Sequence, residues 1–131
     1  MMEHKEITVV FYGRRFPRKD WQANIDDEAV QAFLAQTAKE MTGFGVTLQH
    51  AVEEDVVIDI NGYGDILNAI RLRSPKDGIG NLCLGHIIGS SPRRDLIEDI
   101  KRGINRVAFA PETIEPEDHN KKVCHNCGCG C

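Results

Sequence analysis

Two hydrophobic periods alternate along this chain, and the alternation limits its fold more than any single residue does. Short apolar runs rich in β-branched residues predict strands at 7–11, 46–48, 56–60, 82–88 and 106–110. Apolar residues at helical spacing predict helices at 27–42, 66–70 and 91–104. An alternation of strands and helices along the chain is typical of a sheet whose strands are connected by helices. We therefore expect a small layered α/β domain with a mostly parallel sheet of four or five strands, flavodoxin-like or Rossmann-like in the loose sense.

The length of 131 residues suits one domain with one hydrophobic core. Hydrophobic residues make up 41% and charged residues 27% of the chain, which favours a packed domain over disorder. The regular pattern ends at residue 110, and residues 111–123 combine prolines with acidic side chains. We expect an α/β domain at 1–110, a linker at 111–123 and a cysteine-rich tail at 124–131.

Charge and hydropathy argue against two broad classes of protein. A formal net charge of -4 makes a protein that coats nucleic acid an unfavoured interpretation. No apolar run approaches the length of a bilayer span, and the first six residues have no signal-peptide core. We expect a cytoplasmic protein without membrane or nucleic-acid partners.

The tail carries the strongest chemical signal. Four of the five cysteines stand in a C-x2-C-x-C-x-C pattern, at Cys124, Cys127, Cys129 and Cys131. Thiolates are soft ligands, and four of them complete a tetrahedral zinc shell or the corners of a [4Fe–4S] cluster. The intervening glycines, 128 and 130, let the backbone turn these thiols toward one centre. The pattern predicts a metal site, with an iron–sulfur cluster as first choice and zinc or copper(I) as alternatives; His125 and His119 are further donors nearby.

Other interpretations of the tail stay open. Cys124 and Cys127 form a C-x-x-C pair, a pattern in which a thiol pKa can be depressed, so the tail could be a redox or sulfur-transfer arm. It could also be a thiol-rich end that merely oxidises.

Two basic segments follow predicted strands, where ligands of parallel sheets usually bind. Residues 89–94 combine a glycine turn, a helix start, two hydroxyls and two guanidiniums, which predicts an anion site at Ser90, Ser91, Arg93 and Arg94. The rival interpretation is an ordinary Ser-Pro helix cap with solvated arginines. The second segment predicts a patch for an anion or an acidic partner protein at Arg14, Arg15, Arg18 and Lys19, with a solvated surface run as the rival.

The remaining cysteine and one nearby histidine point to structure rather than chemistry. Cys83 and His86 are three apart on a predicted apolar strand, so we expect them on opposite faces, each as a core residue rather than a ligand.

The leading functional hypothesis is a metal- or iron–sulfur-cluster-binding accessory protein: a scaffold, carrier or electron-relay subunit that exchanges metal, cluster or electrons with a protein partner. No Ser–His–Asp or paired-carboxylate pattern emerges, which favours an accessory protein over an enzyme. The alternatives are a thiol redox or sulfur-transfer protein, and an anion- or nucleotide-binding α/β domain with a structural zinc tail.

Overall fold

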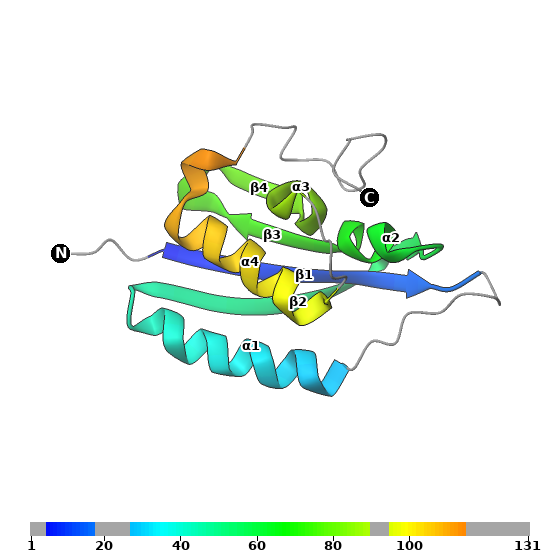
Figure 1. Ribbon diagram of the computed structural model, residues 1–131, viewed down its shortest axis with the longest axis horizontal. Helices are drawn as coiled ribbons and strands as arrows, with labels where there is room; N and C mark the ends of the chain where they lie inside the picture. Colours follow the sequence, from blue (N-terminus) through cyan, green and yellow to red (C-terminus); the bar gives the residue numbers. More distant parts are fainter. Residues whose placement is uncertain (1–4, 18–26, 90–94, 115–131) are drawn as a thin grey trace.

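A four-stranded mixed sheet forms the centre of the molecule (Figure 1). The structure is a computed structural model, and it describes residues 5–17, 27–89 and 95–114. Strands β1 (Lys5–Arg15), β2 (Val46–Asp59), β3 (Ile70–Ser74) and β4 (Ile79–Cys83) lie in the order β2-β1-β3-β4. β1 and β2 are parallel, whereas β3 is antiparallel to both β1 and β4. The predicted α/β class is confirmed, but the expectation of a mostly parallel sheet is wrong.

The connection between β3 and β4 explains the mixed topology. It consists of the short 3-10 helix η1 (Pro75–Asp77) and Gly78, whose φ of 74° lies in the left-handed region. Parallel neighbours need a crossover of a dozen or more residues, so a connection this short makes an antiparallel hairpin. The connection between the parallel strands β1 and β2 is long and carries helix α1 (Asp27–Thr42), whose bounds are those predicted from its apolar stripe.

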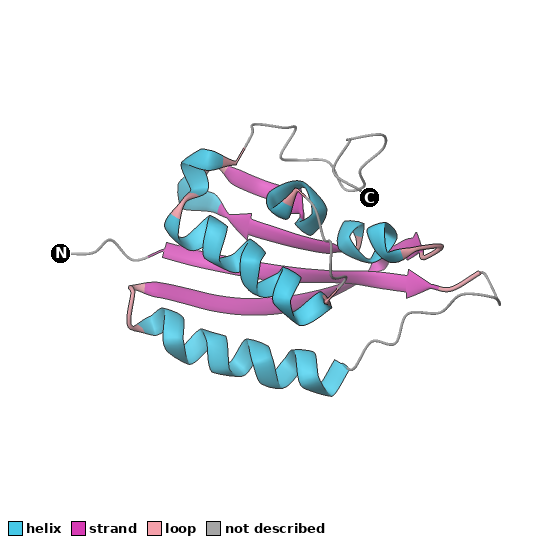
Figure 2. Ribbon diagram, viewed as in Figure 1, coloured by secondary structure: helices cyan, strands magenta, loops and turns pink. Residues whose placement is uncertain are grey.

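Four further segments depart from the expected elements (Figure 2). The strands expected at 46–48 and 56–60 are parts of one long strand, β2, and residues 54–56 have no partner on β1 because the register shifts there. The helix expected at 66–70 is α2 (Tyr63–Asn68), and Ile70 already belongs to β3. The strand expected at 82–88 divides into the end of β4 and helix α3 (Leu84–Ile88).

The last helix replaces a predicted strand. Helix α4 (Leu96–Phe109) begins at an Asp95 cap, later than the expected start at 91, and continues through the segment 106–110 expected to be a strand. Its buried face repeats at Ile100, Ile104 and Val107, which is the helical period carried to the end. A second 3-10 helix, η2 (Pro111–Thr113), follows and packs on α4.

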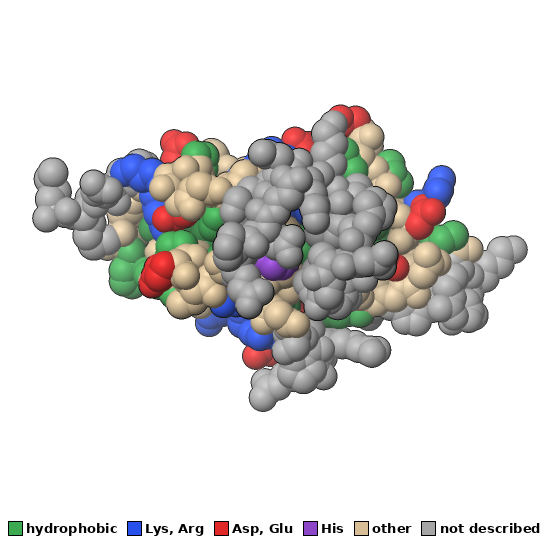
Figure 3. Space-filling model, turned by 90° about the horizontal axis from the view of Figure 1, so that it is seen from above, with side chains coloured by type: hydrophobic (Ala, Val, Ile, Leu, Met, Phe, Trp, Pro, Cys, Tyr) green, Lys and Arg blue, Asp and Glu red, His purple; other side chains and the backbone are tan. Residues whose placement is uncertain are grey.

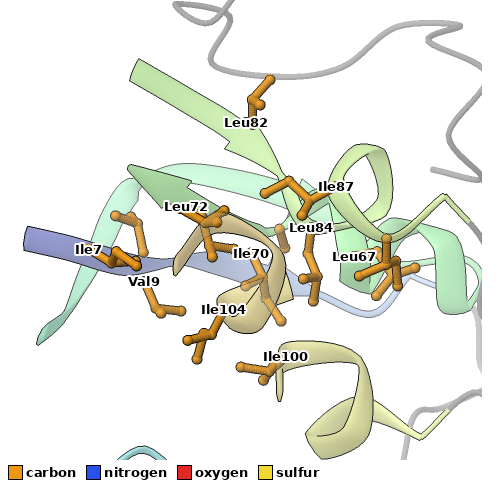
Figure 4. Close-up of a cluster of buried hydrophobic side chains, with 14 of the residues drawn as sticks. Ile7, Val9, Leu67, Ile70, Leu72, Leu82, Leu84, Ile87, Ile100 and Ile104 are labelled. Carbon is orange, nitrogen blue, oxygen red and sulfur yellow. The ribbon is translucent and has the colours of Figure 1, made fainter. Parts of the chain in front are cut away.

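The core lies between α4 and one face of the sheet (Figure 4). Ile7 and Val9 of β1, Leu72 of β3, and Ile100 and Ile104 of α4 are fully buried there. Burying each such side chain contributes about 1.5–3 kcal/mol relative to leaving it exposed. This layer therefore holds α4 against the central strands.

Helices α3 and α4 approach each other closely at a glycine. Gly103 lies inside α4, and a Cβ atom at this position would overlap Cδ1 of Leu84 in α3. Leu84 is fully buried, so its end cannot move away freely. A residue that weakens an isolated helix is thus needed here for packing.

No helix in the described part of the chain is long and apolar enough to cross a membrane.

Candidate functional site

Most of the predicted site residues lie outside the described ranges. This applies to the tail ligands Cys124, Cys127, Cys129 and Cys131 with His119 and His125, to the anion loop Ser90, Ser91, Arg93 and Arg94, and to Arg18 and Lys19. Of the predicted site residues, Arg14 and Arg15 alone belong to the described chain, at the end of β1.

Both of these arginines already hold a carboxylate. Nη2 of Arg14 donates to Oδ1 of Asp27 at 3.2 Å, and Nε of Arg15 donates to Oδ1 of Asp59 at 2.6 Å. The hydrogen bond from Arg15, helped by its charge, holds the pKa of Asp59 below its usual range, and the same contact raises the pKa of Arg15. The predicted basic patch is therefore partly neutralised by its own domain. On the face seen in Figure 3, basic and acidic side chains of the described residues likewise lie interspersed.

The mixed sheet still brings three strand ends to one edge. β1, β2 and β4 run in the same direction. The first basic segment follows β1, a glycine-containing turn at 61–62 follows β2, and α3 follows β4. The main chain joins the first two there, because the N–H of Ile60 donates to the carbonyl of Arg15 at 2.7 Å. The antiparallel strand β3 begins at this edge, where α2 leads into it.

Carboxylates lie at two of the helix starts at this edge, those of α2 and α4. Oδ2 of Asp65 accepts a hydrogen bond from the N–H of Asn61 at 2.8 Å, so an acidic group fills the glycine-rich turn before α2. At the start of α4, Oδ1 of Asp95 accepts from the N–H of Glu98 at 3.2 Å and caps the helix. Asp95 therefore satisfies one of the first amide groups of α4, and the negative charge of both carboxylates disfavours an anion at these helix starts.

A buried tyrosine–aspartate contact links the short helices to α4. The Tyr63 hydroxyl of α2 donates to Oδ2 of Asp99 at 2.6 Å, and Asp99 is almost fully buried. Arg102 reaches Oδ1 of the same carboxylate at 3.3 Å and also donates to the carbonyl of Ile88 at the end of α3. Asp99 thus links α4 to α2, and Arg102 links it to α3.

Sequence reasoning missed a cationic network on the sheet face opposite α4. Arg71 of β3 is 1% exposed, and its guanidinium lies 5.5 Å from the centre of the Tyr12 ring. It donates to Asn68 Oδ1 at 2.5 Å, to the carbonyl of Asn68 at 3.1 Å and to the carbonyl of Asn81 at 3.4 Å. Among the described residues no carboxylate pairs with it. The guanidinium is satisfied by neutral acceptors and an aromatic face.

The same network crosses all four strands. Arg73 of β3 donates to Glu53 of β2 at 2.9 Å and to Asn81 of β4 at 3.1 Å, and the Asn81 amide donates to the Tyr12 hydroxyl at 2.9 Å. A slip of any strand would separate these partners, so the network fixes the register of the sheet. The signal for it was the Ile-Arg-Leu-Arg alternation at 70–73, which has the period of a strand.

Cys83 is a buried structural residue, as expected, but it lies where β4 ends and α3 begins, not in one continuous strand with His86. It is fully buried at the end of β4, and its Sγ accepts a hydrogen bond from the N–H of His86 at 3.3 Å. It therefore caps α3, and His86 lies half-buried on that helix rather than on a strand. Within residues 5–17, 27–89 and 95–114, no three His, Cys, Asp or Glu side chains are grouped closely enough to hold a metal ion.

Comparisons with protein-family models, curated proteins and solved structures found no match to this chain.

Proposed function

We propose that this protein binds an iron–sulfur cluster or a metal ion through Cys124, Cys127, Cys129 and Cys131, and serves a partner protein as scaffold, carrier or electron-relay subunit. The observation that carries the proposal is the spacing itself, four soft ligands within eight residues, separated in part by glycine. An iron–sulfur cluster is the first choice, with zinc or copper(I) as alternatives.

The folded domain supports this proposal by keeping its own thiol apart. Cys83 is fully buried and engaged with the N–H of His86, so it does not compete for metal or exchange disulfides with the tail. The chain therefore carries one structural thiol and four thiols assigned to the cluster. This division provides an internal control for every cysteine experiment.

The domain also offers a fixed point from which the tail departs. Arg106 of α4 donates to the Thr113 hydroxyl at 3.0 Å and to the Thr113 carbonyl, and Ile114 is buried in the core. The nine residues 115–123 separate this anchor from the first cysteine, and fully extended they span roughly 30 Å. A cluster held beyond such a spacer could be presented to a partner while the domain stays folded.

The deciding experiment is anaerobic reconstitution with iron and sulfide, and separately with zinc, followed by elemental analysis and an absorption spectrum. We expect the double variant Cys127→Ser/Cys129→Ser to lose most of the bound metal, because two of four ligands are gone. The matched control is Cys83→Ser, which keeps an acceptor for the His86 N–H and should bind metal like the parent protein.

Each outcome selects among the three hypotheses. A brown protein with stoichiometric iron and sulfide favours the cluster. A colourless protein with stoichiometric zinc favours the anion-binding domain with a structural zinc tail. A metal-free protein whose thiols oxidise and reduce reversibly favours the redox or sulfur-transfer arm. Full metal content in the double variant would refute the four-thiolate site.

A further inference from the structure

An open cavity lies along the outer edge of β2. Its volume is about 300 Å³, and it is lined by Leu34, Ala35 and Ala38 of α1 and by Leu48, Gln49 and His50 of β2. Successive residues of a strand point to opposite faces, so Leu48 and His50 share one face and Gln49 takes the other. The space that touches all three residues lies between α1 and β2, and β1 occupies the other edge of that strand.

The backbone on this edge has hydrogen-bonding groups that the β1 ladder does not use. β2 is an edge strand of the described sheet. The N–H of Lys5 donates to the carbonyl of Gly45 at 3.1 Å, and Lys5 is in register with Val46. Gly45 thus directs its carbonyl to β1, and in a parallel pair every second residue of the strand does the same. Gln49 and Ala51 therefore direct their N–H and C=O groups to β1.

The alternate residues Leu48, His50 and Val52 therefore direct their backbone groups outward, toward the cavity. In the described ranges these three residues make no backbone hydrogen bond outside the ladder with β1. Three outward donor–acceptor pairs in a row are a template for another strand.

The side chains around this edge define what could bind. The wall formed by α1 contributes the small side chains of Ala35 and Ala38, which leave room for an incoming backbone and one apolar side chain. Beyond the cavity, Val52 is 58% exposed and an acidic run follows it directly. Glu53 of this run already holds Arg73, whereas Glu54 and Asp55 are exposed. The edge thus joins an apolar groove to an acidic run.

We propose that an extended segment of a partner protein binds here as a fifth strand, with an apolar side chain in the groove and basic side chains beside Glu54 and Asp55. Main-chain hydrogen bonds to an exposed edge supply affinity in this mode of recognition, and alternate side chains supply specificity. A second copy of this chain fits less well, because antiparallel pairing of two β2 strands would oppose one acidic run to the other. None of the residues that carry this inference belongs to the cysteine tail.

A blocked peptide of alternating threonine and valine that ends in two lysines tests the proposal by NMR. We expect the amide protons of Leu48, His50 and Val52 to shift and to become protected from solvent exchange, while the protection of Gln49 and Ala51 stays unchanged. A matched peptide that ends in two glutamates should bind about tenfold more weakly, because its charges repel the acidic run.

Two variants separate backbone recognition from surface adhesion. His50→Pro removes an outward N–H that the β1 ladder does not use, so the domain should stay folded while the peptide binds about tenfold more weakly. Gln49→Pro removes a ladder N–H and should destabilise the domain. Should His50→Pro also fail to fold, Ala38→Phe fills the groove from the α1 side and should abolish binding without changing the sheet.

The proposal is overturned if the lysine peptide does not bind, if it binds both variants like the parent protein, or if its shifts map to another surface. Sedimentation of the free protein tests whether a second copy of this chain occupies the edge. A dimer whose Leu48, His50 and Val52 amides are already protected without peptide would assign this edge to a second copy instead.

Discussion

The close contact between α3 and α4 predicts that the effect of Gly103→Ala on stability depends on the residue at position 84. Inside a helix, alanine is about 1 kcal/mol more favourable than glycine. At Gly103, however, the added Cβ would overlap Cδ1 of the fully buried Leu84, and overpacking of this kind costs about 1–3 kcal/mol. We therefore expect Gly103→Ala to destabilise the domain by up to about 2 kcal/mol.

In a variant with a shorter side chain at position 84, Gly103→Ala should stabilise the domain instead of destabilising it. Leu84→Ala alone should cost about 2–5 kcal/mol through lost burial and the space left behind. In that background a Cβ introduced at position 103 meets no obstacle at position 84, lies 3.9 Å from Ile87 and Ile88, and keeps the helical preference. Gly103→Ala should then stabilise by about 1 kcal/mol, which leaves a coupling of about 1–3 kcal/mol between the two sites.

Urea denaturation followed by far-UV circular dichroism measures all four proteins of this cycle. Gly43→Ala is the control, because its Cβ would meet only the carbonyl of Glu40, at 3.4 Å. Its effect should stay within about 0.5 kcal/mol. A Gly103→Ala variant that is more stable than the parent, or single effects that add within about 0.5 kcal/mol, would refute the close packing of α3 on α4.

Other parts of the molecule give three further predictions. Truncation after Pro116 should leave the melting temperature of the domain nearly unchanged and remove bound metal, since residues 117–131 are mostly polar and the described core extends to Ile114; a loss of many degrees would mean that the tail is a structural staple. Because the pKa of Asp59 is lowered in the folded state, its pair with Arg15 should stabilise the domain above a pH of about 4 and lose that effect as the pH falls through the folded pKa. An Arg15→Gln variant should raise the titration midpoint of Asp59 measured by NMR, and an unchanged midpoint would contradict the pair. Phosphate should shift the amide signals of residues 89–95 if the predicted anion loop binds, and no shift would leave that loop a helix cap.

The elements that sequence reasoning identified correctly are those whose burial pattern repeats over many residues. Helix α1 has acidic residues in its first turn and an apolar stripe that includes Val30, Leu34 and Met41, and both of its ends are where the pattern places them. The same helical spacing of apolar residues continues from Ile104 to Val107, three residues further, and would have predicted a helix there as well. The β-branched and aromatic residues at 107–109 instead suggested a strand, and packing against the sheet decided against that propensity.

The edge strand and the hairpin were harder to predict, for different reasons. Between His50 and Val57 the side chains of β2 are mostly exposed, so no buried face marks this stretch as a strand. β3 alternates arginine with apolar residues, and its arginines are held by a network that needs Asn68 and Asn81 from elsewhere in the chain. Such a network is visible only once the strands are paired. Of the candidate site, the cysteine pattern remains the part that sequence alone defines.

The central position of β1 bears on how the chain is made. Thr8 is paired with Gln49 on one side and with Arg73 on the other, and both partners come much later in the chain. At a synthesis rate of about 5–20 residues per second, the apolar segment 7–11 waits roughly 3–13 s before its second neighbour has been added. Until β3 has been added, at least one edge of this segment has no partner, and an open apolar edge is prone to aggregation. A nascent chain of this topology should therefore be a client of ribosome-associated chaperones until β3 emerges from the exit tunnel.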